Sequence, residues 1–445
     1  MPRTTWFRLI LQQRHLTTYE AFAIQFSRAA HELAEREGDP RLRSLSVSAR
    51  QFDRWMSGEL RTLPRPDACR VLEHMLGKPV SVLFAVPDDP EGRSKPSAAV
   101  GHEPAPPVAV REEADSPLEI IARARQLTAS NVDTGTLAFV ASSLESVIAR
   151  YEQDGPRVLG AQTRAMRRLI HTFLDGHQPP HLRQELFRLA ARAAGLLGYM
   201  AVNTGNFMLA EAYCTEALDL SRAINDIETE QWVSGTLSFG LYYAGQYAEA
   251  DSCAAAAVEK APRSAQAIRL LVNGRARALA KTRDHDGAKR AIDRALELSD
   301  LHHAPAGITS CISFEPYGHA RTLANAVTAH VSLCNVDQVL KDAKQIDDLV
   351  EHSDSSWSRS LVRLDVATAL LQQRSPDLER ALLLGKEALL LSGDSPVRSV
   401  WQRSHDLYQL ARRWRKQSAV REYGDELRTW SSQLSALAMS RSGAL

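Results

Sequence analysis

The sequence contains few aromatic residues and no long apolar run. Only 6% of the 445 residues are aromatic, whereas 44% are hydrophobic. Alanine and leucine supply most of the apolar surface, a composition that favours helices and offers little of the β-branched and aromatic content of strands. The longest apolar run, around residues 193–202, is far shorter than the roughly 20 residues that a transmembrane helix needs. We therefore expect an all-α protein that does not enter membranes.

The chain also lacks a charge imbalance and a cysteine framework. Its formal net charge is +1, so no whole-chain field attracts polyanions. The five cysteines are odd in number and contain no Cys-x-x-Cys pair, which favours reduced thiols over disulfides. The N-terminus has no apolar stretch of the length that a signal peptide requires. These features predict a cytoplasmic protein.

Familiar catalytic and cofactor motifs are missing as well. Gly77-Lys78-Pro79 and Gly385-Lys386-Glu387 lack the Ser or Thr with which a Walker loop holds Mg²⁺. There is no Gly-x-Ser-x-Gly and no His-Glu-x-x-His. The one tight group of metal-capable side chains follows no familiar zinc spacing: His302, His303, Cys311 and His319. We expect no enzymatic activity, no cofactor and no metal site.

A pattern of small residues, typical of a helical hairpin, occurs twice at a distance of forty residues. Small side chains at these offsets let two antiparallel helices approach closely, and a glycine turns the chain between them. The first set is Gly198, Ala201, Gly205, Ala210 and Ala217; the second is Ser238, Leu241, Gly245, Ala250 and Ala257. Weaker copies follow at residues 276–295, with Asp284-His285-Asp286 as the turn, at Val327–Ile346 and at Val366–Leu391.

A proline-rich stretch divides the chain. Residues 87–117 hold seven prolines among small and charged residues, a composition that cannot bury enough apolar surface to become ordered. We predict three parts: a small N-terminal domain over residues 1–86, a flexible linker over 87–117, and a helical array over 118–445.

The N-terminal domain contains the more specific pattern. Thr17 and Glu20 predict a capping box at the start of one helix. Ser48 predicts the N-cap of another, in which Phe52 and Trp55 share one face. Gly58 then marks the end of that helix.

The spacing Ser-x-x-x-Phe-x-x-Trp-x-x-Gly, followed by a proline, a periodic helix, a glycine and Val80-x-x-Leu-Phe84, resembles the Xre/lambda-repressor-like helix-turn-helix family. Residues 16–23 resemble the start of its first motif helix. The stretch 27–45 departs from the family by adding about 20 residues between the two motif helices. The hairpins resemble tetratricopeptide (TPR) repeats. Together, head, linker and array resemble the helix-turn-helix–TPR regulators common in GC-rich mycelial bacteria, over nearly the whole chain.

This resemblance implies that residues 48–56 enter the major groove of double-stranded DNA. We expect the protein to bind as a homodimer, because one short helix reads few bases. Arg50 and Arg54 would read guanine edges, and Asp53 would accept from cytosine or orient an arginine. Residues 1–86 hold 13 Lys and Arg against 9 Asp and Glu, a weak positive excess. The candidate DNA-binding residues are Ser46, Ser48, Ala49, Arg50, Asp53, Arg54, Arg61 and Arg65.

In TPR hairpins the first helix of each pair lines an inner groove, so the resemblance also implies a site for a peptide, small-molecule or protein effector. The candidate groove residues are Tyr199, Asn203, Trp232, Phe239, Tyr242, Tyr243, Asn273 and Arg277. Each aromatic member could instead pack between hairpins. An alternative to a transcriptional regulator is a TPR adaptor whose N-terminal domain contacts protein and does not bind DNA.

Overall fold

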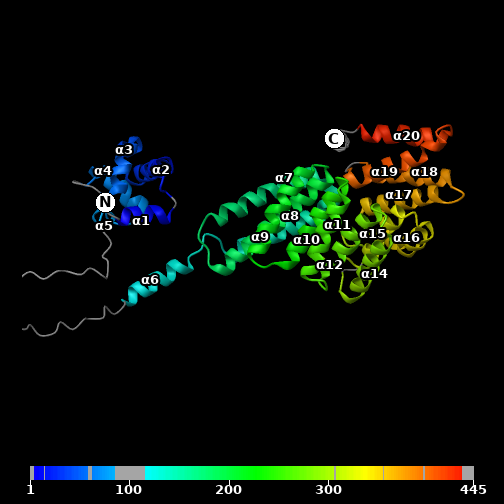
Figure 1. Cartoon of the computed structure of the whole chain (residues 1–445), viewed down its shortest axis with the longest axis horizontal. Helices are drawn as coiled ribbons and strands as arrows, with labels where there is room; N and C mark the ends of the chain where they lie inside the picture. Colours follow the sequence, from blue (N-terminus) through cyan, green and yellow to red (C-terminus); the bar gives the residue numbers. More distant parts are fainter. Residues whose placement is uncertain are drawn as a thin grey trace, which may run out of the picture. The chain divides into compact units, whose positions relative to one another are not determined.

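The computed structural model describes residues 5–14, 16–58, 63–85, 116–304, 307–353, 355–393 and 396–432. Every regular element within these ranges is a helix, as the composition predicts. The chain forms two compact units, Met1–Arg111 and Glu112–Leu445, which are drawn in Figure 1. Nearly all of the predicted linker lies outside the described residues.

The N-terminal unit consists of short helices around an aromatic core. Phe7 stacks on Phe84 with ring centroids 5.0 Å apart, and Phe22 packs on Phe52 at 4.9 Å. Trp55 meets the edge of Phe7 at 6.1 Å. The elements are α1 (Trp6–Gln13), α2 (Tyr19–Glu37), the 3₁₀ turn η1 (Pro40–Ser44), α3 (Ala49–Ser57), α4 (Pro66–Leu76) and α5 (Val80–Leu83).

One detail of this unit differs from the sequence-based expectation. The N-cap of α2 is Thr18, whose hydroxyl accepts from the Ala21 amide at 3.4 Å, so the predicted capping box of Thr17 with Glu20 is wrong by one residue. The additional stretch 27–45 forms the second half of α2 and the turn η1. Gly38, with φ 66°, ends α2 in the left-handed conformation.

The C-terminal unit is a succession of helical hairpins. Its first helices are α6 (Pro117–Thr128), α7 (Thr134–Leu174), which is interrupted at Gly155, and α8 (Pro180–Asn203). The central ones are α9 (Phe207–Ala223), α10 (Ile227–Tyr243), α11 (Tyr247–Lys260), α12 (Ala265–Arg269), the π-helix η2 (Leu270–Ala276), α13 (Arg277–Lys281) and α14 (His285–Leu301). The last are α15 (His319–Ser332), α16 (Val336–Glu351), α17 (Ser356–Gln372), α18 (Leu378–Leu391), α19 (Arg398–Ala411), the 3₁₀ turn η3 (Arg412–Trp414) and α20 (Ser418–Ser431).

The predicted small residues lie where the helices of a hairpin meet. A Cβ atom at Gly198 would come within 2.9 Å of the Cys214 sulfur, on the partner helix. In the next hairpin, the equivalent Ser238 donates its hydroxyl to the Ala250 carbonyl at 2.8 Å. The small-residue spacing therefore reports a close helix–helix contact in both hairpins.

The turns within the first four predicted hairpins share a left-handed residue. Gly205 and Gly245 have φ of 78° and 83°. Arg283 (φ 65°) and Cys334 (φ 58°) take this conformation in the third and fourth hairpins. The third turn was predicted at Asp284-His285-Asp286, which is wrong by about one residue because Asp284 already caps α14 by accepting from the Gly287 amide at 2.8 Å.

The first helices of the hairpins form a continuous inner layer, in which α8 contacts α10, α15 contacts α17, and α17 contacts α19. This layer curls until its two ends meet. α8 touches α19, and Tyr151 of α7 packs edge-on against Trp357 of α17 at 5.2 Å. The inner surface therefore encloses an interior lined by helices from both ends of the array.

Candidate functional sites

Helix α3 is a short, rigid element with both ends capped. The Ser48 hydroxyl accepts from the Gln51 amide at 3.3 Å, and the Gln51 side chain accepts from the Ser48 amide at 3.0 Å, which completes a capping box. Gly58, with φ 69°, ends the helix. Phe52 and Trp55 are both buried, so the prediction that they face the core is confirmed.

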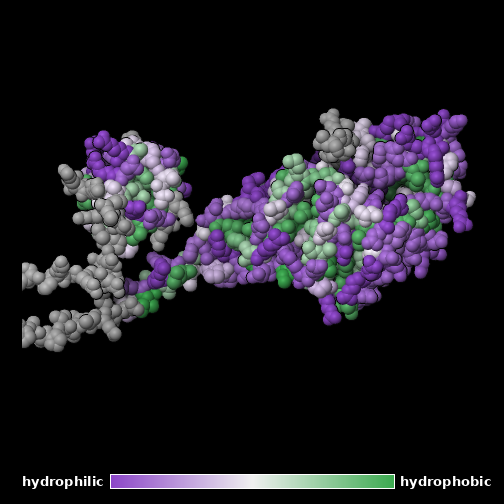
Figure 2. Space-filling view, viewed as in Figure 1, coloured by the Kyte–Doolittle hydropathy of each residue, from purple (hydrophilic) through white to green (hydrophobic). Residues whose placement is uncertain are grey.

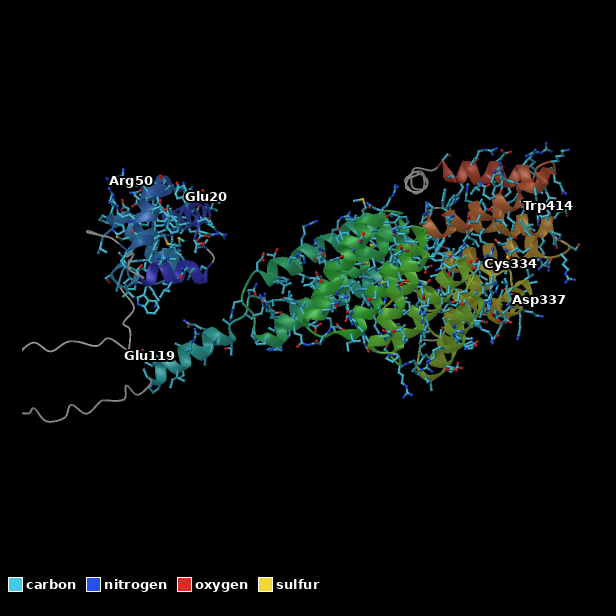
Figure 3. The ribbon with its side chains drawn as sticks, in the orientation of Figure 1. Glu20, Arg50, Glu119, Cys334, Asp337 and Trp414 are labelled. Atoms are coloured by element: carbon cyan, nitrogen blue, oxygen red, sulfur yellow. The ribbon has the colours of Figure 1, made fainter. Side chains whose placement is uncertain are left out.

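The opposite face of α3 carries unpaired charge. Arg50, Asp53 and Arg54 are exposed, and neither arginine makes an ion pair with a described residue. Figure 3 shows Arg50 at the outer edge of its unit. The remaining described candidates are also exposed: Ser46, Ser48, Ala49 and Arg65. Arg61 lies outside the described residues.

The additional stretch 27–45 leaves the contact between α2 and α3 intact. Tyr19, in the first turn of α2, donates its hydroxyl to the Val47 carbonyl at 3.1 Å, just before α3. Phe22 packs on Phe52 at 4.9 Å and meets the edge of Trp55 at 6.3 Å. The extension of α2 packs instead against η1 and α4. The two helices thus pack directly despite the intervening chain.

The predicted groove residues of the array separate into two groups. Tyr199, Phe239 and Trp232 form an aromatic cluster, in which the Tyr199 and Phe239 rings stack at 5.6 Å. Asn203 donates to the Tyr151 hydroxyl at 2.8 Å. Trp232 is fully buried and lines neither of the two inner cavities described below.

The segment between α14 and α15 occupies this part of the interior, which sequence reasoning missed. Trp232 donates its indole N–H to the Ser313 carbonyl at 2.7 Å, and Gln266 donates to the Phe314 carbonyl at 2.6 Å. The Phe314 ring lies 4.4 Å from that of Trp232. The apolar Ile312 and Tyr317, both buried, are the only sequence signal that this loop is not an ordinary surface connection.

The second group surrounds Arg277, the first residue of α13. Its guanidinium donates to the Tyr243 hydroxyl at 2.9 Å and to the Asn273 side chain. Its plane lies over the Tyr242 ring, 4.4 Å from the centroid. Burial acts to raise the pKa of Tyr243, but the positive charges of Arg277 and Arg403 outweigh it and lower that pKa.

Just before Arg277 the helix is wound as a π-helix, which sequence periodicity did not reveal. Gly274 lies within it, and a Cβ atom there would come within 2.7 Å of the Ala254 Cβ. The glycine therefore lets this irregular turn approach α11. Such π turns frequently occur at functional sites.

An inner cavity of about 570 Å³ opens beside the Arg277 group. Residues from α10, α13, α15, α17 and α19 line it. A smaller cavity of about 50 Å³ adjoins Tyr199, Asn203, Phe239 and Asn273. Of the predicted groove residues, Tyr242, Tyr243 and Arg277 line the larger cavity.

The described residues do not gather into a metal site. No three His, Cys, Asp or Glu side chains among them are placed to share an ion. His302 contacts the Arg263 carbonyl and His319 contacts Asp300, so these two histidines have separate partners. Burial raises the pKa of Cys214 to about 12, which keeps that thiol protonated at neutral pH. No described helix has both the length and the apolar content to cross a membrane.

A comparison of the sequence with protein-family models finds no matching family, and a comparison with curated proteins finds no matching relative.

Proposed function

We propose that this chain is a cytoplasmic transcriptional regulator that binds double-stranded DNA through α3 and senses an effector through its helical array. The observation that carries the proposal is the exposed face of α3. Arg50 and Arg54 stand there without an ion pair to any described residue, on a helix that Phe52 and Trp55 fix to the core. Guanidinium groups held in this way suit guanine edges and phosphate oxygens.

Four arginines of the additional stretch and its neighbour α4 do not share this property. Each lies near a carboxylate, so its charge is largely compensated within the unit. The pairs are Arg28 with Glu32, Arg36 with Glu37, Arg43 with Glu35, and Arg70 with Glu37, Asp39 and Asp67. Arg50 and Arg54 differ from these four arginines because no described carboxylate pairs with them, and they lie on the helix that the helix-turn-helix resemblance places against DNA.

The direct contact of α2 with α3 supports the same role. A recognition helix needs a neighbouring helix to fix its angle on the duplex. Tyr19 and Phe22 provide this contact from the first turn of α2, so the additional stretch is compatible with docking.

A homodimer is part of the proposal, and α6 supports it. None of its described residues is buried, and Leu118, Ile120, Ile121 and Leu127 are all exposed. Figure 2 shows apolar side chains along this helix. Several large apolar side chains exposed on one helix are typical of an interaction surface. A second copy of α6 would cover part of this apolar surface and give the two-fold symmetry that paired DNA half-sites require.

The proposal is tested with the full chain and duplexes selected from a random-sequence library. We expect a preferred duplex, with affinity that falls steeply as salt rises. Arg50→Ala with Arg54→Ala should weaken binding about 30-fold or more, since each bidentate contact contributes roughly 1–3 kcal/mol. The control, Arg28→Gln with Arg36→Gln, removes the same charge from paired sites and should change affinity much less. Equal losses in both double variants would contradict the role of α3. The absence of any preferred duplex would favour the adaptor.

A further inference from the structure

The larger inner cavity has an excess of positive charge. Five basic side chains line it: Arg277, Lys281, Arg283, Arg398 and Arg403. Two acidic side chains accompany them, Asp365 and Asp406. At about 570 Å³, its volume is that of a small-molecule site.

The two acids already have partners. Asp365 is buried and accepts from Arg403 at 2.7 Å and from the Thr328 hydroxyl at 2.8 Å. Asp406 accepts from Gln402 at 3.0 Å. Neither Arg277 nor Lys281 forms an ion pair with a described residue. The acids of the cavity therefore do not balance its basic groups.

Arg277 shows this imbalance most clearly. Only 2% of the residue is exposed, yet its hydrogen-bond partners, Tyr243 and Asn273, are neutral. Its Nε atom is buried without a hydrogen-bond partner among the described residues. A buried guanidinium is costly unless an anion accompanies it. The cavity beside it has room for one.

We propose that this cavity binds a small organic anion with at least two negative charges, with its carboxylate or phosphate oxygens against Arg277 and Lys281. The guanidinium fork suits both oxyanions. Tyr242 and Tyr247, whose rings lie 5.4 Å apart on the cavity wall, contact the body of the ligand. This inference deepens the sensing role proposed above and rests on it.

The occupied interior favours a small ligand over an acidic peptide. The segment between α14 and α15 is held beside Trp232, because its Ser313 and Phe314 carbonyls accept hydrogen bonds from Trp232 and Gln266. An extended chain could not follow the inner layer from the cavity past this segment. A compact anion needs only the cavity itself.

The test uses the full chain with citrate and pyrophosphate as probes at constant ionic strength, in calorimetric titration and thermal unfolding. Citrate supplies carboxylates and pyrophosphate supplies phosphates, so the two arms distinguish the sources of the anion. We expect saturable binding of at least one probe at one site per chain. Lys281→Gln should weaken it about fivefold, the contribution of one partly exposed ion pair. Lys289→Gln, on the exposed face of α14, is the matched control and should leave binding unchanged.

Arg277→Gln should abolish binding if it folds, and Lys281→Gln tests the site in either case. No saturable binding of either probe, or equal binding by wild type and Lys281→Gln, overturns the inference. Binding of an oligoglutamate peptide with no binding of citrate or pyrophosphate overturns it as well, in favour of an acidic peptide. DNA binding by the same preparation separates the two proposals. Anion binding without DNA binding would contradict the transcriptional regulator but not the anion site. DNA binding without anion binding would contradict the anion site but not the regulator.

Discussion

Replacing Trp55 by alanine should unfold the N-terminal unit while the array stays folded. The Trp55 ring is 5% exposed and meets the rings of Phe7, Phe22 and Phe84 at 6.1–6.3 Å. Truncating a buried aromatic side chain of this kind costs about 3–5 kcal/mol.

That cost is large for so small a unit. At roughly 0.05–0.15 kcal/mol per residue, about 80 residues have a total stability of about 4–12 kcal/mol. If the total stability lies in the middle of this range, Trp55→Ala removes a third or more of it. If the total lies at the lower end, the substitution removes nearly all of it. The array does not share this core, because the aromatic cluster around Trp55 is confined to the N-terminal unit.

Scanning calorimetry of the full chain measures both units in one sample. We expect the transition of the N-terminal unit to move down or disappear in Trp55→Ala, while that of the array stays in place as an internal control. Arg50→Ala with Arg54→Ala, on the exposed face of the same helix, should change neither transition by more than about 0.5 kcal/mol. An unchanged N-terminal transition in Trp55→Ala would refute the aromatic core. A large loss in the arginine variant would show that the two arginines are structural.

Further predictions concern the array. Ile120→Glu with Ile121→Glu should convert a dimer to a monomer in analytical ultracentrifugation, because both are large apolar side chains exposed on α6; a wild-type monomer would contradict the dimer. Cys334→Gly should stabilise the array by about 0.5–1 kcal/mol in chemical denaturation, because residue 334 has φ 58° and a left-handed conformation costs a non-glycine residue roughly 1–2 kcal/mol; a destabilised variant would contradict this. Burial lowers the pKa of His330 below its ordinary 6.5 despite nearby Asp342. The neutral imidazole therefore contributes fully to the stability of the array above pH 6.5, and this stability is lost as the pH falls through the lowered pKa. In His330→Gln the free energy of unfolding should fall less between pH 6.5 and 5 than in the wild type, and an unchanged dependence on pH would refute this role of His330.

The sequence predicted the helices of the array well, because small residues and turn residues act locally. Gly205 and Gly245 marked two turns correctly, and the spacing from Gly198 located a close helix contact. Arg283 and Cys334 adopt the same left-handed conformation although neither is a glycine, so the residue types at these positions did not indicate a turn. The third turn was misplaced by about one residue for that reason.

The candidate sites depended more on long-range packing. The alternation of Phe52 and Trp55 with Arg50 and Arg54 fixed the two faces of α3 from periodicity alone. Trp232, by contrast, occupies a helix position that the hairpin pattern assigns to the groove. In the structure the ring of Phe314, more than eighty positions away in the sequence, packs against it. No local spacing could reveal that contact.

Genome-wide mapping of the tagged chain on its own chromosome tests the central claim most directly. We expect reproducible enrichment at sites that share a pair of half-sites, and loss of this enrichment in the variant with Arg50→Ala and Arg54→Ala at equal protein abundance. No reproducible enrichment of the wild-type chain, or an unchanged map in the variant, would contradict the claim that α3 binds DNA.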